Sequence, residues 1–152
     1  MTAVDSASDL SADLQLAVER DEVRVHYLPI VGLTEGMVIG VEALARWHRA
    51  DRVLDTQLFL SLAEKTGAIV PIGRRVMQRA CEDVTRWNAA HPDRSPLRLA
   101  VNLSLHQLSE PDAVAQLERT LDETGFDPEQ LSLEMSEDSL HDLGHAGGPG
   151  GR

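Results

Sequence analysis

Gly40-Val41-Glu42-Ala43-Leu44-Ala45-Arg46-Trp47 is the stretch of sequence that decides the fold of this chain. It overlaps a predicted strand, Met37 to Ala45, that follows the short connection Gly32 to Gly36. That connection is too brief for a helical crossover, so the strand should pair antiparallel with the strand before it. Pro29 marks the end of that earlier strand or the outer edge of the sheet. Alternating apolar residues predict the earlier strand: Val23, Val25 and Tyr27.

Helices and further strands follow this hairpin. Asp55 caps a predicted helix that stops at Gly67, a residue suited to the left-handed position after a helix. A later helix carries Pro111 in its first turn and runs to Gly125. Apolar residues at helical spacing mark four helix faces: Leu10, Leu14, Ala17 and Val18 in a helix from about Leu10 to Glu19; Leu58, Phe59, Leu62 and Ala63; Ile72, Val76, Ala80, Val84 and Trp87; Val114, Leu117 and Leu121. The remaining strands are an alternating segment from Leu97 to Ser104 and a last one from Leu131 to Ser136.

This order of strands and helices predicts an α/β fold. Strands separated by helices imply a parallel sheet with helices on its outer face and a site at its carboxyl edge. A complete α/β barrel takes roughly 250 residues, so this chain has room for about half of one. We therefore predict a partial barrel of about four strands, the first of them antiparallel, over residues 10–140. Residues 1–9 are predicted to be a flexible N-terminus and residues 141–152 a Gly-rich disordered tail.

The charge and composition of the chain exclude several kinds of partner. The 25 acidic and 14 basic residues give a formal charge of -11, which repels phosphate backbones and anionic membranes. We expect neither nucleic-acid nor membrane binding. The start of the chain, Met1 to Gln15, is acidic and polar, unlike a secretory signal, and the cytoplasm is the expected location. The single cysteine, Cys81, lies among apolar residues of a helix face and is interpreted as a buried packing residue.

Three acidic or amide residues, each at the end of a predicted strand, suggest half of a metal site: Glu42, Asn102 and Glu137. Each also has a plain interpretation. Glu42 could face solvent or pair with Arg24, and Asn102 could be a satisfied core polar group. Strand parity places Glu134 on the face opposite Glu137, so either a bulge turns Glu137 inward or Glu134 is the inward carboxylate.

Two other patterns are interpreted as non-functional. His141 and His145 have the helical spacing of zinc ligands, but the glycines around them disfavour a helix there. Ser104 and His106, with nearby acids, could suggest a nucleophile and a base. Nothing in the sequence places them in a triad, and we reject that interpretation.

The chain resembles the EAL domain family. Five blocks in order carry the resemblance: Tyr27-Leu28-Pro29-Ile30-Val31; Gly40-Val41-Glu42-Ala43-Leu44-Ala45-Arg46-Trp47; Phe59 with Leu62-Ala63-Glu64-Lys65-Thr66-Gly67; Val101-Asn102-Leu103-Ser104; Leu133-Glu134-Met135-Ser136-Glu137. The resemblance extends from about Leu10 to Leu140, which corresponds to the amino-terminal half, or slightly more, of that domain.

The resemblance implies a phosphodiesterase that hydrolyses cyclic di-GMP to linear pGpG, folded as a modified α/β barrel whose first strand runs against the others. It also implies that Glu42, Asn102 and Glu137 bind Mg²⁺ or Mn²⁺ and that Arg46 holds a phosphate of the ligand. The chemistry agrees, because hard divalent cations take oxygen ligands and a planar guanidinium suits phosphate. Arg46 and Trp47 could equally be an exposed cation beside a packing aromatic.

The departures from the family pattern bear on activity. The family's next strand ends in paired aspartates before a Phe-Gly sequence, and later strands supply a lysine, a glutamate and a glutamine, none of which has a counterpart here. Leu28 stands where the family usually has a ligand-contacting glutamine, which should weaken binding of cyclic di-GMP. Asp55 replaces a proline, one helix-start residue for another.

Three hypotheses follow from this pattern. The first is a truncated EAL module, catalytically inactive by itself, that acts in cyclic di-GMP signalling by binding through Arg46 or by association. The second is an active phosphodiesterase completed by another chain or by a lost reading frame, and the third is a non-functional remnant. A sheet that stops at Leu131 to Ser136 leaves an unpaired edge, so we expect self-association or a partner chain there.

Overall fold

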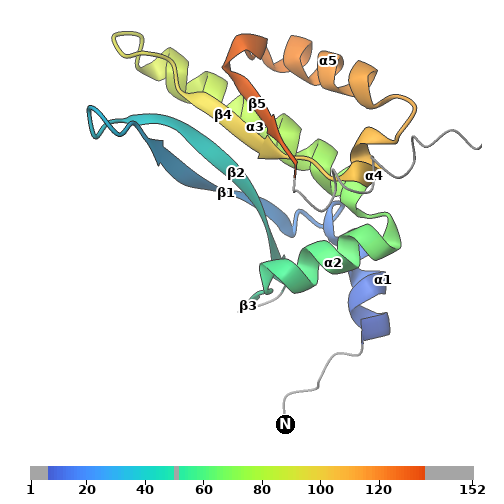
Figure 1. Ribbon diagram of the computed structural model, residues 1–152. Coiled ribbons are helices and arrows are strands. Elements are labelled where there is room, and N and C mark those ends of the chain that lie inside the picture. The colour runs from blue at the N-terminus through green and yellow to red at the C-terminus, as the bar shows by residue number, and fades with distance from the viewer. Residues whose placement is uncertain (1–6, 50–51, 136–152) are drawn as a thin grey trace, which may run out of the picture.

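The computed structural model describes residues 7–49 and 52–135 of the chain. In chain order the elements are α1 (Ala7–Ala17), β1 (Val23–Val31), β2 (Val38–Arg49), β3 (Arg52–Val53), α2 (Thr56–Thr66), α3 (Ile69–Ala90), β4 (Arg98–Asn102), α4 (Leu105–Leu108), α5 (Ala113–Thr124), the 3-10 turn η1 (Pro128–Gln130) and β5 (Leu131–Glu134). One curved sheet carries the long helix α3 along one face, with α5 beside it (Figure 1). The predicted α/β architecture is confirmed.

The sheet has the strand order β1-β2-β4-β5, with β3 paired to β2 outside this path. β1 and β2 are antiparallel, whereas β2, β4 and β5 run parallel. The predicted antiparallel first strand is therefore confirmed, and the two-residue β3 adds a fifth strand to the four expected. Pro29 lies within β1, opposite Val41. Because β1 is an edge strand of the described sheet, a residue without a backbone N–H is tolerated there.

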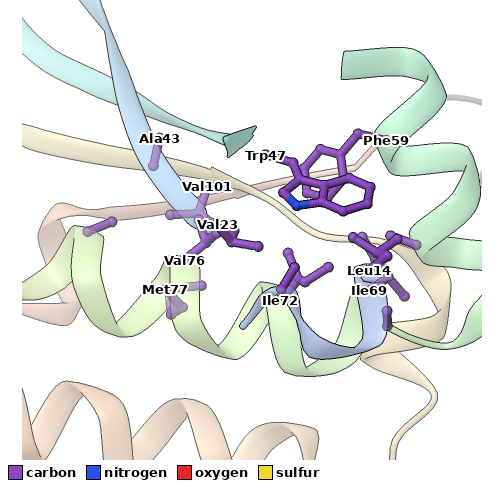
Figure 2. Packing of buried hydrophobic residues seen from close by; sticks show 14 of the residues in the cluster. Leu14, Val23, Ala43, Trp47, Phe59, Ile69, Ile72, Val76, Met77 and Val101 are labelled. Carbon is purple, nitrogen blue, oxygen red and sulfur yellow. The ribbon is translucent and has the colours of Figure 1, made fainter. Parts of the chain in front are cut away.

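The core lies between α3 and one face of the sheet, and α1 and α2 close its end near the carboxyl end of β2 (Figure 2). Trp47 from β2 and Phe59 from α2 are fully buried, with ring centroids 6.1 Å apart. Leu14 of α1 is also fully buried in this cluster. The indole Nε1 of Trp47 donates to Glu22 Oε2 at 2.9 Å, so its buried polar group is paired. Trp47 is a packing aromatic, as one interpretation of the sequence held.

The helix boundaries around α2 follow the predicted signals. The Asp55 side chain accepts a hydrogen bond from the amide of Leu58 at 3.1 Å, and Gly67 adopts φ 76° at the C-terminus. Four residues of the predicted stripe on α3 are buried: Ile72, Val76, Ala80 and Val84. Trp87, the fifth residue of that stripe, is half-buried and packs edge-on against Tyr27, with ring centroids 4.8 Å apart.

A polar network joins β1 to α3 on this same covered face. The Tyr27 hydroxyl donates to Asp83 Oδ2 at 2.7 Å, and Arg86 donates to Asp83 Oδ1 at 2.6 Å. Burial, and then the Asp83 carboxylate, raise the pKa of Tyr27. Cys81 is fully buried nearby in α3, and burial raises the pKa of its thiol to about 11. Its interpretation as a packing residue is confirmed.

The segment after β4 departs from the prediction. Pro111 was expected in the first turn of a helix, but α5 begins at Ala113, so Pro111 lies ahead of it. The carboxylate of Asp112, directly before α5, accepts a hydrogen bond from Arg74 at 2.9 Å rather than capping the helix. Of the predicted apolar face of α5, Val114 is 71% exposed. Only Leu117 and Leu121 of that face pack against the core.

The short helix α4 was missed, although its start signal is present in the sequence. Ser104 and Gln107 form a capping box, in which each side chain accepts a hydrogen bond from the other residue's backbone amide. This role occupies the Ser104 hydroxyl, in agreement with the rejection of a nucleophile. Gln107 packs over Gly73 of α3, where an added Cβ would lie 1.6 Å from Gln107 Nε2. A side chain at position 73 would therefore displace the Gln107 amide, which takes part in the capping box.

The helix ends and outer strands differ slightly from their predicted bounds. α1 begins at Ala7 and ends at Ala17, where Leu10 to Glu19 was expected. β5 ends at Glu134, and the predicted end of this strand at Ser136 lies outside the described residues. His141, His145 and the predicted Gly-rich tail lie outside them as well.

Candidate functional site

The candidate residues lie on the inner face of the sheet, which is the face turned away from α3. Alternation along β2 turns Val41 and Ala43 to the helices, where they are buried, and turns Glu42 the other way. In β4 the buried residues Leu99 and Val101 likewise leave Asn102 on the inner face. The strand pattern that builds the core therefore also presents the polar residues on one surface.

Strand pairing brings Glu42 and Asn102 together. β2 and β4 are parallel, and Glu42 pairs with Ala100, so Asn102 lies one inner-face position closer to the carboxyl edge. The Asn102 amide Nδ2 donates to Glu42 Oε1 at 2.8 Å. This contact excludes the interpretation in which Glu42 pairs with Arg24, because Arg24 lies opposite Arg46 and Glu42 lies opposite Leu28.

The geometry of this pair fits a hard cation. The hydrogen bond from Asn102 fixes the orientation of the Glu42 carboxylate, while Glu42 Oε2 and Asn102 Oδ1 are the oxygen atoms of the pair that this bond does not use. Within residues 7–49 and 52–135, no group of three His, Cys, Asp or Glu side chains is placed to hold a metal ion. The described part of the chain thus offers a two-residue oxygen set for a divalent cation.

The third predicted ligand, Glu137, lies outside the described residues. β5 does bring another carboxylate to the same row, because Glu134 is the register partner of Asn102. Glu134 is exposed, and its carbonyl oxygen accepts the Leu103 amide at 2.8 Å. On strand parity Glu134 shares the inner face with Asn102, which is the second of the two alternatives left by the sequence.

Arg46 lies on the same inner face, further toward the carboxyl end of β2 than Glu42. It is half-buried, and its Nη1 donates to the carbonyl of Ala45 at 2.9 Å. Arg24 of β1 is directly opposite. Two guanidinium groups therefore share one cross-strand row, with the His26–Leu44 row between it and Glu42, which makes this end of the inner face suitable for an anion.

Two histidines lie in the same region of the inner face, and the sequence did not identify them as candidate residues. His26 Nε2 and His48 Nε2 lie 3.1 Å apart. Burial, followed by the charges of Arg24 and His26, lowers the pKa of His48. Strand parity could have placed each histidine on the inner face, but the diagonal contact between them depends on the twist and register of the hairpin.

Leu28 lies opposite Glu42 on β1 and is 54% exposed. An apolar side chain thus occupies the inner face directly beside the candidate metal ligand. It can donate no hydrogen bond to a nucleotide, unlike the glutamine that the family usually has there.

A twisted sheet with helices on its outer face and polar groups at the carboxyl ends of parallel strands defines a protein of the α/β barrel class, in which that edge is the ligand-binding edge. The half-barrel described by this chain places Glu42, Asn102 and Arg46 toward that edge.

The chain belongs to the EAL domain family, whose sequence model matches residues 11–146. It is 40% identical over 127 residues to MucR of Pseudomonas aeruginosa, a bifunctional diguanylate cyclase/cyclic di-GMP phosphodiesterase. It is 34% identical over 132 residues to the cyclic di-GMP phosphodiesterase NbdA of the same organism. These matches cover 82% and 86% of this chain but only 18% and 17% of the relatives.

Solved structures agree with this assignment. The MucR phosphodiesterase in complex with cyclic di-GMP superposes with a TM-score of 0.81 at 36% identity, over 90% of this chain and 55% of that one. An EAL enzyme in a cGMP-bound form superposes with a TM-score of 0.80 at 25% identity, over 92% of this chain and 40% of that one. The chain is therefore an EAL domain related to cyclic di-GMP phosphodiesterases, and it spans about half the length of the solved MucR chain.

Among the described residues, none of the helices combines the length and the apolar character that crossing a membrane requires.

Proposed function

We propose that this chain binds cyclic di-GMP and a divalent cation, Mg²⁺ or Mn²⁺, on its inner face, and that the 152 residues by themselves do not hydrolyse the ligand. The observation that carries the proposal is the 2.8 Å hydrogen bond between Asn102 Nδ2 and Glu42 Oε1. It brings together, from strands 60 residues apart in sequence, the two side chains that the family resemblance assigns to the metal.

Each residue has a distinct role in this proposal. Glu42 and Asn102 hold the cation through their remaining oxygens, with Glu137 as the third ligand by family resemblance. Such an ion, when bound, polarises the phosphodiester and lowers the pKa of a bound water. Arg46 binds a phosphate oxygen of the ligand through its guanidinium group.

The same features argue against turnover by this chain alone. Hydrolysis of a phosphodiester commonly uses two metal ions, and the described residues bring only Glu42, Asn102 and Glu134 to one region of the inner face. Leu28 beside Glu42 further reduces the number of polar contacts available to the nucleotide. Binding without hydrolysis is the activity that this set of groups supports best.

Calorimetric titration with cyclic di-GMP in the presence of Mg²⁺ or Mn²⁺ tests the binding. Arg46→Ala should weaken the affinity by about 10- to 100-fold, since a charge-assisted hydrogen bond to phosphate is lost. Arg119→Ala is the matched control, because Arg119 is an exposed arginine on α5 whose guanidinium donates to Gln116 Oε1 at 3.2 Å. Equal affinity for both variants, or no saturable binding by the unaltered chain, would contradict the proposal.

Chromatographic detection of linear pGpG tests the second half of the proposal. The purified chain with Mn²⁺ and cyclic di-GMP should yield no product. Metal-dependent product formation that Glu42→Ala abolishes and Glu118→Ala on α5 does not would establish an active enzyme instead.

We also infer that the chain associates with a partner or a second copy through the β5 side of the sheet. Within the described residues β5 pairs only with β4, and Leu133 is 41% exposed. An unpaired edge with apolar side chains favours pairing with another strand. Light scattering after size exclusion should give a concentration-dependent mass, reduced by Leu133→Lys but not by Val53→Lys on β3, which is 50% exposed and lies off the β5 side of the sheet. A constant monomer mass at all concentrations would exclude self-association.

A further inference from the structure

His26 and His48 form a pair of imidazoles that the proposed function does not use. Their Nε2 atoms lie 3.1 Å apart, their ring centroids are 5.3 Å apart, and the ring planes are inclined by 51°. Backbone pairing holds both strands in place. His26 lies opposite Leu44, and the amide of His48 donates to the carbonyl of Glu22 at 2.8 Å. The two side chains therefore meet without any rearrangement of the hairpin.

We propose that His26 and His48 chelate a Zn²⁺ ion through their Nε2 atoms at a site separate from the hard-cation site. Zn–N bonds of about 2.0–2.1 Å in tetrahedral geometry place two nitrogen ligands about 3.3 Å apart. Rings that direct their Nε2 atoms at such an ion have centroids about 5.2 Å apart by the same geometry. The observed separations of 3.1 and 5.3 Å lie near both values. Because the two rings approach each other nearly head-on, ion binding requires each ring to tilt so that both Nε2 lone pairs converge on one point.

The protonation of the pair is compatible with this role. In the absence of an ion, the 3.1 Å separation suits an Nε2–H of one ring donating to the other. Chelation requires both Nε2 lone pairs, so both neutral rings carry their proton on Nδ1 and the hydrogen bond is exchanged for two metal bonds.

The chemistry of the donors separates this site from that of Glu42 and Asn102. Imidazole favours Zn²⁺ over Mg²⁺, whereas carboxylate and amide oxygens favour Mg²⁺. No third His, Cys, Asp or Glu joins the pair among the described residues, so two coordination positions are left to water. The neighbouring positive charge of Arg24 opposes the cation, and we therefore expect an affinity well below that of a four-ligand structural zinc site.

Titration calorimetry with Zn²⁺ tests the proposal on the full chain. His141 and His145 could contribute ligands of their own, so all variants carry His141→Ala and His145→Ala. One saturable Zn²⁺ per chain should be bound, and either His26→Gln or His48→Gln should abolish it. His106→Gln, an exposed histidine on α4, is the matched control and should leave zinc binding unchanged.

The opposing outcomes are distinct. The proposal would be overturned if the parent with His141→Ala and His145→Ala bound no Zn²⁺ saturably, or if His26→Gln and His48→Gln bound Zn²⁺ as tightly as that parent. Loss of zinc in Glu42→Gln with retention in His26→Gln would assign the ion to the oxygen site. If Zn²⁺ binds as expected while cyclic di-GMP does not, the proposed function fails and this site stands.

A second measurement needs no substitution at the pair. In ¹⁵N spectra of the histidine side chains, Zn²⁺ should shift the Nε2 resonances of His26 and His48 together, and Mg²⁺ at the same concentration should not. Shifts confined to other histidines would refute the site even if the glutamine variants failed to fold.

Discussion

The two faces of β2 differ sharply. Facing the helices, Val41, Ala43 and Trp47 are at most 7% exposed and belong to one continuous cluster. On the inner face, Glu42 and Arg46 are only partly buried, and their neighbour Leu28 on β1 is 54% exposed. The covered face therefore stabilises the fold, whereas the inner face presents chemical groups whose stabilising contacts are few.

Replacing the largest side chain of the covered face should have the largest effect. Trp47→Ala removes a fully buried indole and its hydrogen bond to Glu22, which should lower the free energy of unfolding by about 3–5 kcal/mol. Leu28→Ala on the inner face should change it by less than about 0.5–1 kcal/mol. Urea denaturation of both variants measures the difference. If the two variants lowered the free energy of unfolding by similar amounts, the inner face would be packed as tightly as the covered face.

Replacing a polar group on the covered face should lower the free energy of unfolding by a smaller amount. Tyr27→Phe removes the 2.7 Å hydrogen bond to Asp83 but leaves the ring against Trp87. Asp83 keeps its contact with Arg86, so the free energy of unfolding should fall by only about 0.5–1.5 kcal/mol. The near-ultraviolet circular dichroism of the tryptophans should be retained. A loss above about 3 kcal/mol would mean that the hydroxyl, rather than the ring, anchors β1 to α3.

The smallest expected effect on stability comes from His48 on the inner face, and it depends on pH. The pKa of His48 is lowered by burial and by Arg24 and His26, which face it from β1, so the unfolded chain takes up this proton first. Stability should therefore fall as the pH drops below about 6.5, the ordinary pKa of histidine, toward the lower pKa of the folded state. Arg24→Gln should raise the pKa of His48, as followed by proton NMR. An unchanged titration in this variant would mean that burial and His26, rather than Arg24, lower the pKa of His48.

Much of the fold could be predicted because its signals are local. The cap at Asp55, the left-handed Gly67 and the apolar stripe of α3 each depend on residues within a few turns of one another. The late start of α5 was not predicted, because Asp112 bonds to Arg74, which is 38 residues away in sequence. β3 was missed because two residues are too few for a periodic pattern.

Part of the candidate site could also be predicted, because its motif blocks are local signals. The motif blocks identified Glu42, Asn102 and Arg46 from the sequence, whereas their common face follows from the burial pattern of β2 and β4. The proximity of His26 to His48 had no local signal, since it joins two strands through 22 residues of intervening chain.

The sequence by itself determined the family, the order of strands and helices, and the residue types of the site, because periodicity and motif blocks are properties of neighbouring residues. Only the tertiary structure decided which groups meet: Asn102 with Glu42, Glu134 in the row of Asn102, and His26 with His48. The physical reason is that strand register depends on the packing of segments far apart in the chain, and a shift of one residue would turn each of these side chains to the opposite face.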